Sequence, residues 1–151
     1  MNKVTVRLVG GLGNQLHCYA FGMALANQQN VSLEVDCHSG YWNDLYSRVY
    51  LLDSFSAIKI DKMNAPSSRL GKFLFRLKLK AFQPISVALP LFLRPIVNEG
   101  QPTGYNQRLL NTRYSFSPYF MGYWCFYRYY DKIEQQLRSM LTPPTPSDLS
   151  V

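Results

Sequence analysis

Hydrophobic residues at the start of the chain alternate with polar ones and then change to a helical spacing. Residues 3–9 (KVTVRLV) carry apolar side chains at every second position, which predicts a strand. After three closely spaced glycines, residues 15–29 carry apolar side chains three and four positions apart, which predicts a helix capped by Gly13 or Asn14. Residues 31–36 (VSLEVD) return to a strand pattern. The order of strand, glycine loop, helix and strand is typical of a parallel α/β sheet.

The middle of the chain has weaker patterns. A short buried segment is expected at residues 51–55 and a short third strand at residues 58–60. Residues 84–104 are rich in proline and residues 105–119 are largely polar, so both segments are expected to be irregular. An apolar and aromatic run at residues 121–124 predicts the end of another strand.

Two later segments have the period of an amphipathic helix. Residues 68–82 carry Leu and Phe on one face and basic residues on the other. The basic residues that share this face are Arg69, Lys72, Arg76 and Lys80. Residues 126–141 carry apolar side chains at alternating steps of four and three, and Glu134 and Arg138 form a favourable pair one turn apart. Prolines in residues 142–147 (TPPTPS) cannot continue this helix, because proline lacks the amide donor.

Composition narrows the class of protein. The length of 151 residues predicts about one domain, and a hydrophobic fraction of 47% excludes a disordered chain. The 16 Lys and Arg residues outnumber the 9 Asp and Glu residues, and the resulting net charge of +7 favours an anionic partner. Three cysteines without a CxxC spacing and two histidines predict neither a disulfide scaffold nor a metal site. We expect no secretory signal and no membrane span, and therefore a cytoplasmic protein.

The glycine loop at residues 10–15 (GGLGNQ) is the first candidate for chemistry. Between a strand and a helix it would place free backbone amides at a helix N-terminus, where a phosphate is favoured. It is not a Walker A loop, because no Lys-Ser/Thr pair follows the last glycine. A dinucleotide fingerprint fits in part, since Gly11, Gly13 and the later Asp36 match, but Leu16 replaces the third glycine. A tight turn without a ligand is the alternative.

Two longer motifs resemble those of glycosyltransferase family 11, the α-1,2-fucosyltransferases. Residues 10–26 (GGLGNQLHCYAFGMALA) are similar to its N-terminal G-x-LGNQ signature, with His17 and Cys18 where the family has Phe and Gln. Residues 122–138 (GYWCFYRYYDKIEQQLR) are similar to its Gly-Tyr-Trp-Gln segment and the helix that follows, with Cys125 in place of Gln. The motifs occur in the order of the family, and the resemblance spans essentially the whole chain.

This resemblance implies an α/β fold, a Rossmann-like N-terminal domain of a GT-B-type glycosyltransferase at residues 1–141. The basic helix at about residues 68–82 would be an insert, and residues 142–151 would begin a proline-rich interdomain linker. The resemblance also implies an inverting, metal-independent enzyme that needs no cofactor. Such an enzyme would transfer fucose from GDP-fucose to the 2-hydroxyl of a galactose-type acceptor. The C-terminal donor domain, with its His-x-Arg-Arg-Gly-Asp segment, is absent from this sequence, so we expect an inactive fragment.

The resemblance also assigns binding residues. Gly11, Gly13 and Asn14 are expected to form a wall of the donor site, and helix capping is the alternative role of Asn14. Tyr123 and Trp124 are candidates to stack on the acceptor sugar, and a place in the core is the alternative for both.

The remaining expectations concern catalysis, partners and location. His17 and His38 are candidate bases, and a structural role is the alternative for each. The basic face at residues 68–82 is expected to touch an anionic membrane or to pack on the domain, and nucleic acid is not an expected partner. The protein would act in surface glycan synthesis, in the cytoplasm or peripherally at the inner membrane. The competing functions are a Rossmann-type nucleotide or dinucleotide-binding module without transferase activity, and a remnant without a ligand.

Overall fold

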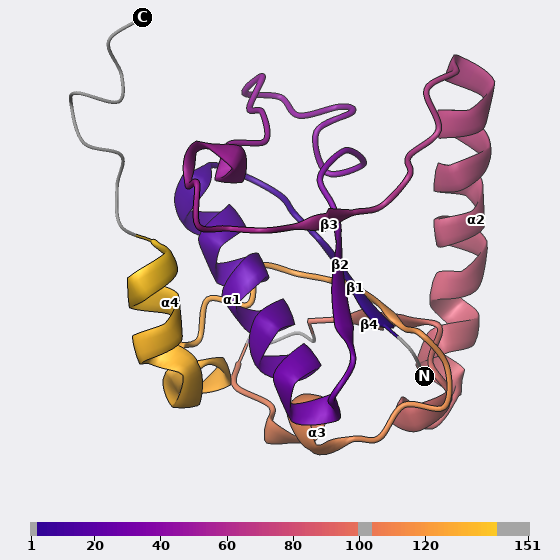
Figure 1. Ribbon diagram of the computed structural model, residues 1–151. Coiled ribbons are helices and arrows are strands. Elements are labelled where there is room, and N and C mark those ends of the chain that lie inside the picture. The colour runs from indigo at the N-terminus through magenta and orange to yellow at the C-terminus, as the bar shows by residue number, and fades with distance from the viewer. Residues whose placement is uncertain (1–2, 100–103, 142–151) are drawn as a thin grey trace, which may run out of the picture.

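A five-stranded, all-parallel sheet forms the centre of the computed structural model, which describes residues 3–99 and 104–141 (Figure 1). The strands follow the order β3-β2-β1-β5-β4 across the sheet. Their bounds are β1 (Lys3–Arg7), β2 (Ser32–Asp36), β3 (Asp61–Lys62), β4 (Ile96–Asn98) and β5 (Tyr119–Met121). The predicted α/β class and its Rossmann-like winding are therefore confirmed.

The first β-α-β unit forms as predicted, with one shift at the start of its helix. Helix α1 (Leu12–Gln29) begins after Gly11, so the predicted caps Gly13 and Asn14 lie inside its first turn. Asn30 ends the helix in the left-handed conformation, and its amide bonds back to the carbonyl groups of the last turn. The helix packs closely on the sheet at Gly22, where an added Cβ would lie 2.7 Å from a methyl group of Leu33.

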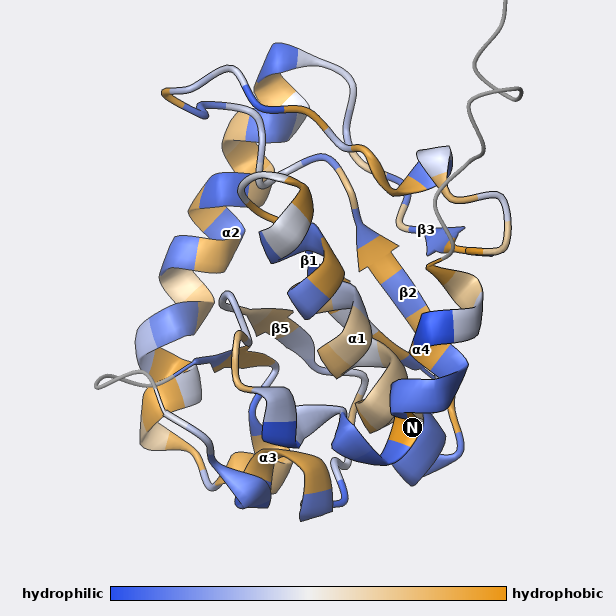
Figure 2. Cartoon of the chain, turned by 90° about the vertical axis from the view of Figure 1, so that its left-hand side faces the viewer, coloured by the Kyte–Doolittle hydropathy of each residue, from blue (hydrophilic) through white to orange (hydrophobic). Residues whose placement is uncertain are grey.

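Helices cover both faces of the sheet (Figures 1 and 2). One face carries α1, the short helix α3 (Gln107–Asn111) and α4 (Glu134–Met140). The other face carries only α2 (Arg69–Ala88), which approaches the sheet near β4. Because it lies between the sheet and the α3–α4 layer, α1 is buried on every side over residues 18–26.

Helix α2 extends beyond its predicted end. The Ser68 side chain accepts a hydrogen bond from the amide of Gly71 and caps the helix, which begins one residue after the predicted start at 68. The helix then continues through Pro84 into a segment predicted to be irregular. Proline removes one helical hydrogen bond, but this turn is exposed and water can solvate the freed carbonyl. Ser86 fixes the end of the helix, since its hydroxyl donates to the Phe82 carbonyl and accepts from the amide of Ile96.

Several short elements differ from the sequence prediction. Strand β4 and helix α3 lie in segments predicted to be loop, and β5 begins two residues before the predicted strand end at 121–124. Strand β3 begins after the predicted range 58–60. Ile58, which was expected in this strand, lies outside it and is buried in the core. The predicted 126–141 helix is replaced by two 3₁₀ turns and the shorter α4. These elements depend on pairing with distant segments, which a local pattern does not encode. The predicted linker at 142–151 lies outside the described residues.

Candidate functional site

The carboxyl ends of β1, β4 and β5 meet at one edge of the sheet. From β1 the chain winds outward through β2 and β3, and then crosses to β4 and returns to β5 beside β1. Ligands of open α/β sheets bind at such a reversal of strand order. A cleft of about 390 Å³ lies at this edge. Its lining includes Arg7, Gly10, Arg48, Asn98, Gly122 and Tyr123.

The glycine loop at this edge is held by its own polar residues. Gly10 has a φ of +74°, and an added Cβ would lie 2.4 Å from the side-chain nitrogen of Asn14. Gln15 is fully buried and ties the loop to the segment beside it. Its amide nitrogen donates to the carbonyls of Gly10 (3.1 Å) and Val49 (2.8 Å), and its oxygen accepts from the amide of Leu51. The sequence analysis missed both of these structural roles.

Gly11 and Gly13 have no comparable role in the fold. An added Cβ at either position meets no atom within 4 Å, and neither residue has a positive φ. Gly11 provides no side chain to cap α1, and no side chain of the described residues takes its place. The first turn of α1 therefore presents open backbone amides, to which a ligand can approach closely. This placement agrees with the predicted donor-site wall, although donor binding itself stays a prediction.

The guanidinium groups of Arg7 and Arg48 line the cleft together with the Asp44 carboxylate, and neither Arg was predicted from the sequence as a site residue. The Arg7 Nη2 atom donates to the carbonyl of Ser39 (3.0 Å), while its Nε is buried without a hydrogen-bond partner among the described residues. Arg48 forms an ion pair with Asp44, and hydrogen bonds from Arg48 lower the pKa of that carboxyl. Arg7 is one of the polar residues that alternate with apolar ones in the first strand. Its position at the carboxyl end of that strand could therefore have been predicted from the sequence.

Asp36 ends β2 but is closed to a ligand. The residue is fully buried, and one carboxylate oxygen accepts hydrogen bonds from the amides of His38 and Ser39. The other oxygen accepts from the hydroxyl groups of Ser39 and Tyr119. Burial and the neighbouring Asp36 carboxylate raise the pKa of the Tyr119 phenol. A dinucleotide site needs this carboxylate for the ribose, so the arrangement disfavours that competing function.

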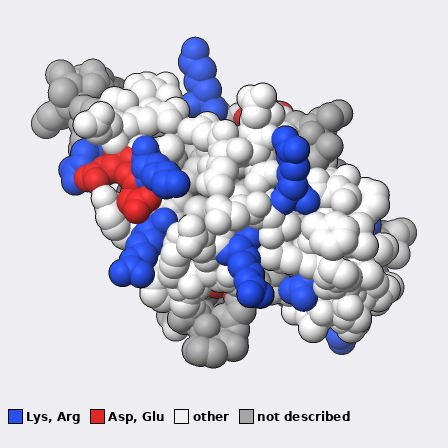
Figure 3. Space-filling model, turned by 90° about the horizontal axis from the view of Figure 1, so that it is seen from below, with Lys and Arg blue, Asp and Glu red and all other residues white. Residues whose placement is uncertain are grey.

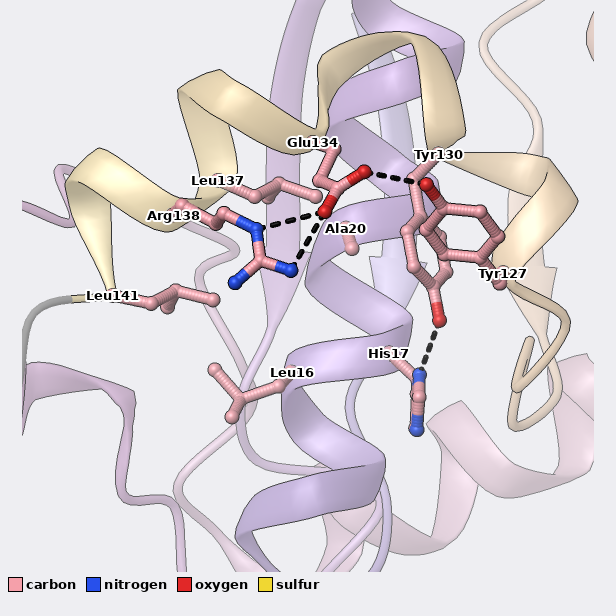
Figure 4. Close-up of a pocket in the computed structure, with 9 residues that line it drawn as sticks. All are labelled: Leu16, His17, Ala20, Tyr127, Tyr130, Glu134, Leu137, Arg138 and Leu141. Carbon is pink, nitrogen blue, oxygen red and sulfur yellow. Dashed lines mark hydrogen bonds and ion pairs between the residues drawn. The ribbon is translucent and has the colours of Figure 1, made fainter.

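His17 lines a different hollow from the cleft. Its Nδ1 lies 2.6 Å from the hydroxyl of Tyr130, and both residues border a hollow of about 540 Å³ between α1 and α4 (Figure 4). Leu16 and Leu137 give this hollow apolar walls, and the ion pair between Glu134 and Arg138 crosses its rim. The expectation that His17 could reach the cleft is therefore wrong for this structure. Its position fits the structural alternative, while His38 is exposed near the cleft edge.

The two aromatic candidates separate in the structure. Tyr123 is 49% exposed and lines the cleft. Trp124 is fully buried and stacks on Phe21 with ring centroids 4.1 Å apart. Its backbone turns inward at a φ of +56°, and Glu99 accepts hydrogen bonds from the amides of Tyr123 (2.7 Å) and Trp124 (3.0 Å). Stacking of Trp124 on a sugar is therefore excluded by its burial, and the core alternative is correct.

Within residues 3–99 and 104–141, no three His, Cys, Asp or Glu side chains come together as metal ligands could. None of the helices in these ranges combines the length and the apolar character that crossing a bilayer requires.

Comparison with known proteins gives one relative. No protein-family model matches the sequence, and no solved structure matches it. An alpha-1,2-colitosyltransferase of Escherichia coli is 29% identical over 147 residues, which are 95% of this chain and 46% of the relative. The chain thus spans about half the length of the curated relative it matches. It is similar to a glycosyltransferase over nearly all of its own length, as its two motifs predicted, and this similarity does not extend to fucose as the sugar.

Proposed function

We propose that this chain is the N-terminal, Rossmann-like domain of an α-1,2-fucosyltransferase, which transfers fucose from GDP-fucose to the 2-hydroxyl of a galactose-type acceptor. The observation that carries the proposal is the cleft at the strand reversal, which Arg7 and Gly10, the first residue of the glycine loop, line together. Similarity to a glycosyltransferase along 95% of the chain supports the reaction class, and the α-1,2 linkage in the relative's name agrees with the proposed acceptor hydroxyl. Colitose, the sugar named for the relative, is the competing donor sugar.

The cleft offers chemistry suited to a nucleotide diphosphate sugar. Backbone amides at a helix N-terminus and a guanidinium group both stabilise phosphate oxygens, most strongly when negative charge develops on the leaving group. Tyr123 would pack against a pyranose face. Asp44 is a poor candidate for the base, because its pKa is lowered by Arg48 and its carboxylate is engaged there. A complete site would also require the donor domain implied by the resemblance, so the isolated chain is expected to bind ligands without transfer.

Ligand binding by the 151-residue chain tests this proposal directly. Calorimetric titration with GDP-fucose, GDP and NAD is expected to give binding of the two guanine nucleotides and none of NAD, because Asp36 is not free to hold a ribose. Binding of NAD alone would reverse the assignment in favour of a dinucleotide module. Fusion of the chain to the unmatched part of the E. coli relative then allows transfer from GDP-fucose and GDP-colitose to be compared.

Two glycines of the same loop provide a matched pair of variants. Gly13→Val is expected to weaken GDP binding about tenfold and leave the melting temperature nearly unchanged, because its Cβ points into open space where the ligand would lie. Gly10→Ala is expected to lower stability by about 1–2 kcal/mol, because its left-handed backbone and the contact with Asn14 disfavour a side chain. Calorimetry and thermal unfolding separate the two effects. If Gly13→Val bound GDP as tightly as the unchanged protein, this loop would not be part of the donor site.

A further inference from the structure

Helix α2 leaves an apolar face without a partner among the described residues. Five large hydrophobic side chains on its outer side are 52–66% exposed. They are Leu70, Phe73, Leu74, Leu77 and Ile85. Along the whole 20-residue helix only Ser86 is buried. Figure 1 shows α2 alone on its side of the sheet, so no other helix covers this stripe.

The opposite face of α2 packs on the domain, and two of the predicted basic residues lie on this face. Phe75 contacts the rings of Trp42 and Tyr119 at centroid distances of 5.6 and 6.3 Å. Lys72 and Arg76 lie over the Trp42 ring, at 5.8 and 5.4 Å from its centroid. Two of the four predicted basic residues therefore pack on the domain, as the packing alternative expected, and membrane contact stays a prediction.

Three other basic side chains of α2 have no partner among the described residues. Arg69 and Lys80 border one side of the apolar stripe and Lys78 borders the other, as the 100° step of a helix requires. No Asp or Glu occurs between Asp61 and Glu99 in the sequence. In Figure 3 the acidic side chains in view gather mainly on the α4 side, and basic ones stand alone elsewhere. The stripe is thus flanked by positive charge with which no residue that the structure describes forms an ion pair.

We propose that α2 docks this domain on an anionic lipid surface. A helix with an apolar stripe between Lys and Arg side chains lies in a membrane interface, with its apolar residues among the headgroups and its charges at lipid phosphates. Charge complementarity decides for lipid over a second copy, because pairing two α2 faces would bring like charges together. Arg69, Lys78 and Lys80 make the phosphate contacts, and Leu70, Leu74 and Leu77 insert.

Docking through α2 would also bring the candidate site close to the lipid surface. A second hollow of about 290 Å³ is lined by Arg76 and Lys80 of α2, and it shares Arg7 and Gly40 with the cleft. If the proposed function holds, this arrangement suits an acceptor glycan carried on a membrane lipid. The docking itself does not depend on that function.

Sedimentation with vesicles tests the docking. The 151-residue chain is expected to bind phosphatidylcholine vesicles that contain phosphatidylglycerol, to bind pure phosphatidylcholine much more weakly, and to lose affinity as salt is raised. The variant Arg69→Glu/Lys78→Glu/Lys80→Glu is expected to bind about 100-fold more weakly. A matched control, Lys59→Glu/Arg113→Glu/Arg128→Glu, changes the net charge equally at exposed residues away from α2 and should keep most of the affinity.

A second variant tests insertion of the apolar stripe. Leu70→Gln/Leu74→Gln/Leu77→Gln keeps good helix formers at exposed positions, so circular dichroism should be unchanged while vesicle binding falls about tenfold for each leucine that inserts. Unchanged binding of this variant, or an equal loss in the control, would overturn the proposal. Sedimentation without vesicles would instead identify a second copy as the occupant. GDP titration of the leucine variant, whose changed residues line neither the cleft nor its adjoining hollow, keeps a failure of docking distinct from a failure of the proposed function.

Discussion

Replacing Trp124 with alanine is expected to lower the free energy of unfolding by about 4 kcal/mol. The indole is fully buried, stacks on Phe21, and meets Phe120 and Tyr129 edge to face. Its removal would leave a large cavity between α1 and the sheet. Since folded domains are stable by only about 5–15 kcal/mol, this single change would remove a large share of the stability and lower the melting temperature. Urea unfolding followed by circular dichroism measures the loss.

The neighbouring Tyr123→Ala variant is the control for this prediction. Tyr123 is half exposed at the cleft, so its removal should change the unfolding free energy by less than about 0.5 kcal/mol. It should instead weaken binding of a galactose-type acceptor, measured by saturation-transfer NMR. The interpretation would be wrong if Trp124→Ala were as stable as the unchanged protein and had lost acceptor binding.

Replacing Arg7 with alanine is expected to weaken GDP binding by about 10–100-fold, which corresponds to about 1.5–3 kcal/mol for a hydrogen bond to a charged group. Arg7 lines the cleft and its adjoining hollow, and its buried Nε has no partner among the described residues. A diphosphate oxygen in the cleft would accept a hydrogen bond from the same guanidinium group. Calorimetric titration of the 151-residue chain with GDP measures the loss.

Two further Arg variants distinguish hydrogen bonding by the Arg7 guanidinium from a general effect of positive charge on GDP binding. Arg7→Lys keeps the charge without the planar fork, so it should recover only part of the GDP affinity. Arg113→Ala removes an exposed and unpaired charge far along the chain and should bind GDP as the unchanged protein does. A change of less than twofold for Arg7→Ala, with stability intact, would move the donor site away from this cleft.

The candidate site could be predicted only in part. The glycine loop was visible as a motif, and the structure places its first residue, Gly10, in the lining of the cleft, while an added Cβ at Gly11 or Gly13 would meet no atom within 4 Å. Arg48 gave no local signal, because it reaches the cleft through a loop whose path is set by contacts with Asp44 and Gln15. The partner of His17 was equally hidden, since Tyr130 lies 113 residues further along the chain.

The sequence by itself determined the opening β-α-β unit, the glycine turn and the cap of α2. In each case a few neighbouring residues fix the outcome, through periods of two and 3.6 or through a side chain that bonds its own backbone. Tertiary structure alone decided the three-residue strands β4 and β5, the burial of Trp124, and which face of α2 points outward. An amphipathic pattern shows that a helix has an apolar and a polar face, but it does not show which face points toward the domain. That direction depends on which distant surface, here Trp42 and Tyr119, is present to pack against.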